Sequence, residues 1–100
     1  MKTIFLFIMV FLGAQPAYAD DVIEAVPSNW RLQNYLNESK VVTWFTGSPC
    51  SNGQLLFSPN TSEETLNRYW SLVLTAKAAS KIIGVYYDPM NCQITSFYAK

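Results

Sequence analysis

The sequence predicts a small α+β domain, mostly β, in which one long helix precedes a C-terminal hairpin. Three observations indicate this fold class: residues 41–46 are rich in β-branched and aromatic side chains, residues 62–79 have apolar side chains at helical spacing, and residues 92–98 alternate between polar and apolar. Strands combined with a single helix form either an open sheet or a small barrel closed by the helix. A chain of 100 residues has room for one hydrophobic core.

Residues 1–19 are typical of a secretory signal peptide. Lys2 gives a positive start, residues 4–14 are apolar, and Ala17-Tyr18-Ala19 is a small-residue cleavage pattern. A bilayer-spanning helix takes roughly 20 apolar residues, so an uncleaved membrane anchor is the less favoured interpretation. We expect the chain from residue 20 onward to be periplasmic or secreted, with no segment inserted in a membrane.

The charge balance argues against nucleic acid as a partner. Residues 20–100 carry six basic and seven acidic side chains. Binding of polyphosphates depends on a clear excess of positive charge, which is lacking here.

Two cysteines, Cys50 and Cys92, allow a single intramolecular disulfide. An oxidising compartment favours this bridge, which would stabilise the fold by about 4 kcal/mol in the chain-entropy model. A redox-active pair is the alternative, but the two residues are far apart and lack the Cys-x-x-Cys spacing that lowers a thiol pKa.

The N-terminal half predicts two or three strands. Residues 20–29 are acidic and contain a proline, so we expect a flexible lead-in before a domain that covers residues 30–100. Residues 30–36 favour a strand, and residues 41–46 predict a buried strand. The Asn-Gly pair at 52 and 53 is a typical hairpin turn, after which residues 54–57 would return as a partner strand.

The helix is predicted over residues 62–79, followed by two strands. Thr61 and Glu64 have the spacing of a capping box, in which each side chain bonds the backbone of the other residue. The expected packing side consists of five residues at three- and four-residue spacing: Leu66, Tyr69, Trp70, Val73 and Ala76. Residues 82–87 and 92–98 then predict a hairpin around a turn at 88–91.

The residue types give little support for catalysis. The chain has no histidine, which removes the commonest general base and the commonest zinc ligand. Glu38 and Asp88 are the one conceivable carboxylate pair for a glycosidase. We therefore expect no enzymatic activity, no cofactor and no metal site, and a small hydrolase remains the third hypothesis.

Aromatic residues are the richer signal for binding. Tyr86 and Tyr87 are neighbours on a predicted strand, so one should face the core and the other solvent. An exposed tyrosine beside Asp88 and Asn91 could stack on a sugar and hydrogen-bond its hydroxyls. The candidate ligand-binding residues are therefore Tyr86, Tyr87, Asp88 and Asn91. The two tryptophans at 44 and 70 are expected to build the core.

Three segments resemble a known group of small exported bacterial proteins: Gly47-Ser48-Pro49-Cys50, the helix end at residues 72–81, and Cys92-Gln93-Ile94. This group is similar in turn to the OB-fold B subunits of AB5 toxins, of the subtilase-cytotoxin B type. The resemblance implies an OB-like barrel and identical subunits in a glycan-binding ring. The toxin subunits are longer and place their cysteines differently, and none of their sugar-binding residues maps onto this chain.

The sequence therefore suggests a non-catalytic, exported binding module that recognises a glycan or a protein surface, with assembly into a homo-oligomer implied by the resemblance. The alternative hypothesis is a periplasmic interaction or inhibitor protein of an envelope or secretion machine, acting through a sheet edge or an aromatic surface. Fold similarity alone does not decide between them.

Overall fold

The computed structural model describes residues 20–36 and 40–100, so the expected signal peptide and Glu38 lie outside the described residues. Five strands, one short 3₁₀ helix and one long helix make up the fold. In chain order these are β1 (Asp21–Ala25), β2 (Arg31–Tyr35), β3 (Lys40–Trp44), η2 (Ser51–Gly53), α2 (Glu63–Ala79), β4 (Ile83–Asp88) and β5 (Gln93–Ala99). Neither helix in this part of the chain is long and apolar enough to cross a bilayer.

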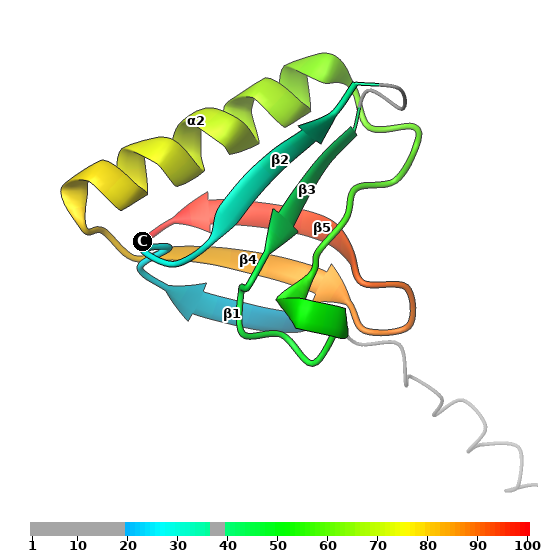
Figure 1. Ribbon diagram of the computed structural model, residues 1–100, viewed down its shortest axis with the longest axis horizontal. Helices are drawn as coiled ribbons and strands as arrows, with labels where there is room; N and C mark the ends of the chain where they lie inside the picture. Colours follow the sequence, from blue (N-terminus) through cyan, green and yellow to red (C-terminus); the bar gives the residue numbers. More distant parts are fainter. Residues whose placement is uncertain (1–19, 37–39) are drawn as a thin grey trace, which may run out of the picture.

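The strands form two antiparallel sheets, and the predicted α+β fold class is confirmed. One sheet has the order β1-β4-β5, and the other consists of β2 and β3. Figure 1 shows the β2–β3 hairpin inclined steeply to the three-stranded sheet, with α2 running along one side of the molecule. The single bridges Thr43–Leu55 and Leu56–Gln93 connect the segment after β3 to both sheets. The described ladders are thus two open sheets joined by isolated bridges.

The expectation of a flexible lead-in over residues 20–29 is wrong, because β1 occupies half of it. Val22 lies opposite Tyr86 and Ile23 opposite Val85 in an antiparallel ladder with β4. Ile23 is half-buried and packs against the core, whereas Val22 is exposed. This alternation suits an edge strand with one buried face. Its partner lies some 60 residues further along the chain, so the local acidic composition conceals it.

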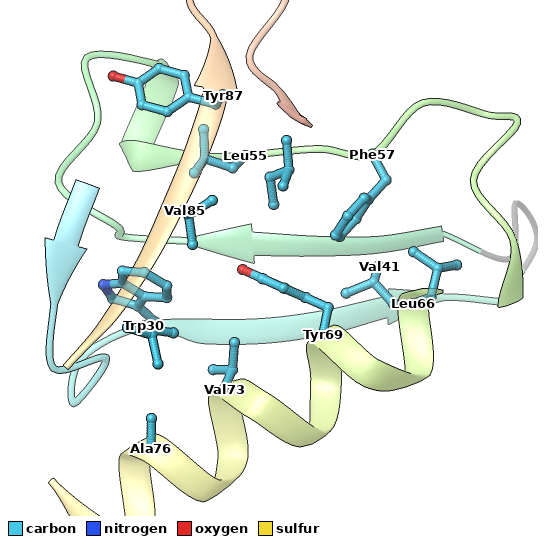
Figure 2. Close-up of a cluster of buried hydrophobic side chains, with 12 residues drawn as sticks. Trp30, Val41, Leu55, Phe57, Leu66, Tyr69, Val73, Ala76, Val85 and Tyr87 are labelled. Carbon is cyan, nitrogen blue, oxygen red and sulfur yellow. The ribbon is translucent and has the colours of Figure 1, made fainter. Parts of the chain in front are cut away.

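The core is organised around Tyr69, which is fully buried on α2. Its hydroxyl is 2.7 Å from the hydroxyl of Thr43, also fully buried, and its ring contacts Phe57 and Phe97 edge-on. Figure 2 shows Tyr69 reaching from α2 toward the strands. This pair satisfies two polar groups that would otherwise be unpartnered in an apolar interior. The remaining core contributors from α2 are the predicted Leu66, Val73 and Ala76.

The helix ends at the predicted residue, Ala79, but its N-terminal cap is one residue later than expected. Ser62 is the N-cap residue, and its Oγ accepts a hydrogen bond from the Thr65 N–H at 3.1 Å. The expected capping box of Thr61 and Glu64 is therefore wrong. Both Thr61 and Ser62 have a side-chain oxygen suited to the role, and Ser62 has the extended backbone of an N-cap residue, with φ −71° and ψ 153°. Glu63 and Glu64 occupy the first turn, where they complement the helix dipole.

The disulfide between Cys50 and Cys92 is confirmed, and it ties the η2 loop to the start of β5. Parallel to it, the Leu56 N–H donates to the Cys92 carbonyl at 2.8 Å, and the Ile94 N–H donates to the Leu56 carbonyl at 2.7 Å. The predicted return of residues 54–57 is therefore partly realised: one residue pairs with β3 and the next with β5. This segment joins the two sheets.

Candidate binding surface

Arg31 and Trp44 face each other across the β2–β3 hairpin, as directly opposed residues of the ladder. The Arg31 guanidinium carbon lies 5.3 Å from the centre of the Trp44 ring system. This distance is within the range of a cation–π interaction. Trp44 is half-buried and lies outside the core cluster, so the expectation that it builds the core is wrong. The core tryptophan is Trp30, which is 4 % exposed, while Trp70 packs partly buried against the core.

Gln33 fixes both members of this pair. Its side-chain oxygen accepts from the Trp44 indole N–H at 3.0 Å and from the Arg31 guanidinium at 3.3 Å. One amide oxygen therefore holds the indole edge and the guanidinium together. Both donors are satisfied without a carboxylate, so the guanidinium keeps further N–H groups available to a partner.

Phe45 completes the surface in an unusual backbone conformation. Its φ is 63°, in the left-handed region, and its side chain is 50 % exposed. This region is strained for a bulky residue and costs about 1–3 kcal/mol. In a regular strand Phe45 would point to the opposite face from Trp44. Instead its ring centre lies 6.3 Å from that of Trp44 and 5.5 Å from the Arg31 guanidinium.

The η2 loop holds Phe45 in this conformation. The Phe45 N–H donates to the Asn52 carbonyl at 2.9 Å, and the Thr46 N–H donates to the Gly53 carbonyl at 3.2 Å. The Thr46 hydroxyl also donates to the Gly53 carbonyl, at 2.6 Å. Because Cys50 begins this loop and is bonded to Cys92, the disulfide fixes the loop that sets the direction of the Phe45 ring. We call Arg31, Trp44 and Phe45 the Arg–aromatic surface.

The sequence-predicted tyrosines divide between two faces, as expected from strand alternation. Tyr87 is buried at 3 % exposure, and Tyr86 is 39 % exposed on the other side of the sheet. Burial raises the pKa of Tyr87, and the nearby Asp21 carboxylate adds to the increase. Tyr86 lies 5.9 Å from Tyr98, measured between ring centres. The two neighbours therefore cannot contact one ligand together.

Asp88 and Asn91 use their side chains to build the turn. Asp88 Oδ1 accepts from the Met90 N–H at 2.8 Å, and Asn91 Oδ1 accepts from the Gln93 N–H at 3.0 Å. These contacts are typical of Asx turns. Both side chains therefore bond the backbone of the turn between β4 and β5.

Next to Tyr86, the outward face of the three-stranded sheet carries a second polar network. Tyr98 donates a hydrogen bond to Glu24, and Lys100 is 3.0 Å from the same carboxylate. The hydrogen bond from Tyr98 and then that from Lys100 lower the pKa of Glu24, while the carboxylate raises the pKa of Tyr98 to about 12. The Tyr98 ring also covers Gly84, where a Cβ would overlap it. This network joins the first and last strands of the sheet.

Four clefts among the described residues are small. Their volumes are about 130–230 Å³, below the ~300 Å³ at which pockets for small molecules begin. A further hollow, of about 640 Å³, is a wide open groove along the exposed side of α2 between Glu64 and Thr75. The shape of this part of the molecule favours contact through a surface over enclosure of a small ligand.

The sequence offered a partial signal for the Arg–aromatic surface. Trp44 and Phe45 are adjacent bulky residues before Gly47, and the local sequence predicts both as part of a buried strand. Arg31 gave no signal, because its role depends on the hairpin register that places it opposite Trp44. The unusual backbone of Phe45 depends on a loop that is closed only in three dimensions.

Comparisons of the chain with models of protein families, with curated proteins and with solved structures found no match.

Proposed function

We propose that this chain is an exported, non-catalytic binding module whose Arg–aromatic surface contacts its partner. The observation that carries the proposal is Phe45: an apolar ring, half exposed, kept there by a backbone conformation that opposes folding. Strain of this kind persists where the surrounding structure enforces it, and it clusters at ligand clamps and switch regions. An exposed ring contributes less to folding stability than a buried one, so core packing does not explain this conformation.

Two features support export. The N-terminal sequence is typical of a signal peptide, and the disulfide is compatible with an extracellular or periplasmic location. The ring of identical subunits, implied by the resemblance to toxin B subunits, stays a prediction. Light scattering on the purified protein tests it, because a pentamer has five times the mass of a monomer.

The experiment compares the wild-type protein with Phe45→Asn on a glycan array and on a displayed library of random decapeptides. Asparagine tolerates the left-handed backbone better than most residues, so the fold is kept while the ring is lost. We expect binding to weaken by tenfold or more in Phe45→Asn and to persist in Tyr86→Ala. Unchanged binding in Phe45→Asn, or loss only in Tyr86→Ala, would overturn the assignment of the Arg–aromatic surface.

A separate observation favours a protein surface over a glycan as the partner. The described clefts are too small or too open to enclose a small molecule, whereas Arg31, Trp44 and Phe45 lie together at the surface. Aromatic and arginine side chains dominate the binding energy of many protein interfaces.

A further inference from the structure

We infer that the partner of the Arg–aromatic surface is a protein segment that carries an Asp or Glu side chain, and that this carboxylate binds Arg31. The inference rests on the proposed function and specifies its partner class. It is carried by three observations on the hairpin: the charge of one face, the hydrogen-bonding character of its polar groups, and the two aromatic rings beside Arg31.

The face of the hairpin that carries Trp44 is positively charged. The register places six residues on it by strand alternation: Arg31, Gln33, Tyr35, Lys40, Val42 and Trp44. Two of the six are cationic and none is acidic. The ion pairs of the described residues, Glu64–Arg68 and Glu24–Lys100, leave Arg31 without a carboxylate partner.

The polar atoms beside Arg31 favour a carboxylate over a neutral sugar. The Gln33 side-chain oxygen already accepts two hydrogen bonds, so the groups left at this point are the N–H donors of Arg31 and of the Gln33 amide. Sugar hydroxyls need acceptors as well as donors. A carboxylate needs donors only, and the planar guanidinium binds it with two parallel hydrogen bonds.

The partner is expected to approach the outer face of the hairpin, because the helix occupies the unpaired side of β2. In Figures 1 and 2, α2 runs along the side of β2 away from β3, and Lys77 Nζ donates to the Trp30 carbonyl, directly before β2, at 2.6 Å. Arg31 and Tyr35 are exposed at the two ends of β2. Glu63 lines a small cleft with Asn34 near the Tyr35 end, so the carboxylate is favoured at the Arg31 end.

The aromatic rings add the apolar part of the contact. The Trp44 and Phe45 ring centres lie 6.3 Å from each other and 5.3 and 5.5 Å from the guanidinium carbon. Both rings are therefore on the same side of the guanidinium, where an apolar side chain next to the acidic residue would rest. Aromatic and arginine side chains together dominate the binding energy of many protein interfaces. The expected segment thus combines one Asp or Glu with neighbouring apolar or β-branched residues.

The test is selection from a displayed library of random decapeptides on the purified wild-type protein. We expect enriched peptides to contain Asp or Glu beside apolar residues, and to bind at least tenfold more weakly to Arg31→Gln. Arg31→Lys should give an intermediate loss, because it keeps the charge without the planar fork. Arg68→Gln is the matched control, an exposed arginine on α2 paired with Glu64, and should change binding by less than twofold.

Enrichment of peptides without acidic residues, or equal binding of acidic peptides to wild type and Arg31→Gln, would overturn the inference. Binding on the glycan array that depends on Phe45, with no peptide enrichment, would overturn the inference and leave the proposed function standing. Absence of both signals would overturn both. Unfolding midpoints of the variants near that of wild type confirm that any loss concerns the surface.

Discussion

Gly53 packs directly against the backbone of Phe45. A Cβ atom at position 53 would lie 3.0 Å from the Phe45 Cα and 2.7 Å from the Thr46 nitrogen, and Gly53 itself has a φ of 65°. Gly53 is therefore required for two reasons: its backbone is left-handed, and there is no space for a side chain. The loop that aims Phe45 outward depends on glycine here.

Gly53→Ala should therefore be strongly destabilising, by about 3 kcal/mol, because the clash adds to the backbone strain. Gly47→Ala is the control: it also has a positive φ, but no atom lies near its Cβ position, so a loss of about 1 kcal/mol is expected. Urea denaturation measures both. Equal losses in the free energy of unfolding would mean that the close contact of Gly53 with Phe45 and Thr46 does not affect stability.

The buried hydroxyl pair of Thr43 and Tyr69 gives a second prediction. Tyr69→Phe leaves the Thr43 hydroxyl buried without its partner, which should lower the free energy of unfolding by about 1–3 kcal/mol. Thr43→Val combined with Tyr69→Phe removes both groups and should lose less than the sum of the single changes. Strict additivity in this double-mutant cycle would show that the hydrogen bond is unimportant.

The helix cap can be tested at two neighbouring residues. Ser62→Ala removes the oxygen that accepts from Thr65 and should cost about 1 kcal/mol. Thr61→Ala should have little effect, because the Thr61 side chain does not cap the helix. A larger loss for Thr61→Ala would restore the position predicted from the sequence.

The network of Tyr98, Glu24 and Lys100 predicts a change with pH. The pKa of Glu24 is lowered first by Tyr98 and then by Lys100, so its contribution to stability is present above its ordinary pKa and lost as pH falls through the lowered value. Tyr98→Phe should raise the pKa of Glu24, as followed by NMR, and move acid unfolding to higher pH. Lys100→Gln should raise it less. The opposite order would contradict the assigned causes.

Local signals predicted α2 and the β4–β5 hairpin, because helical spacing and strand alternation are properties of neighbouring residues. They did not reveal β1, whose pairing with β4 spans most of the chain. They also misplaced Trp44, since a β-branched and aromatic run predicts a strand without saying which face is covered. The Arg–aromatic surface depends on hairpin register and on a loop closed by Cys50 and Cys92, and both are long-range properties.

In the proposed function, the strained backbone of Phe45 presents the phenyl ring to a partner. Phe45→Gly and Phe45→Ala remove the same ring and differ in tolerance of the left-handed backbone. That backbone costs an alanine about 1–2 kcal/mol, and the extra freedom of glycine in the unfolded chain offsets about 0.5–1 kcal/mol.

The most direct measurement is the free energy of unfolding of both variants, together with their binding to the decapeptides selected by the wild type. We expect Phe45→Gly to be more stable than Phe45→Ala by roughly 0.5–1 kcal/mol, and both variants to bind at least tenfold more weakly than the wild type. Wild-type binding by both variants would show that the ring does not contact the partner, and greater stability of Phe45→Ala would show that the backbone at this residue is not strained.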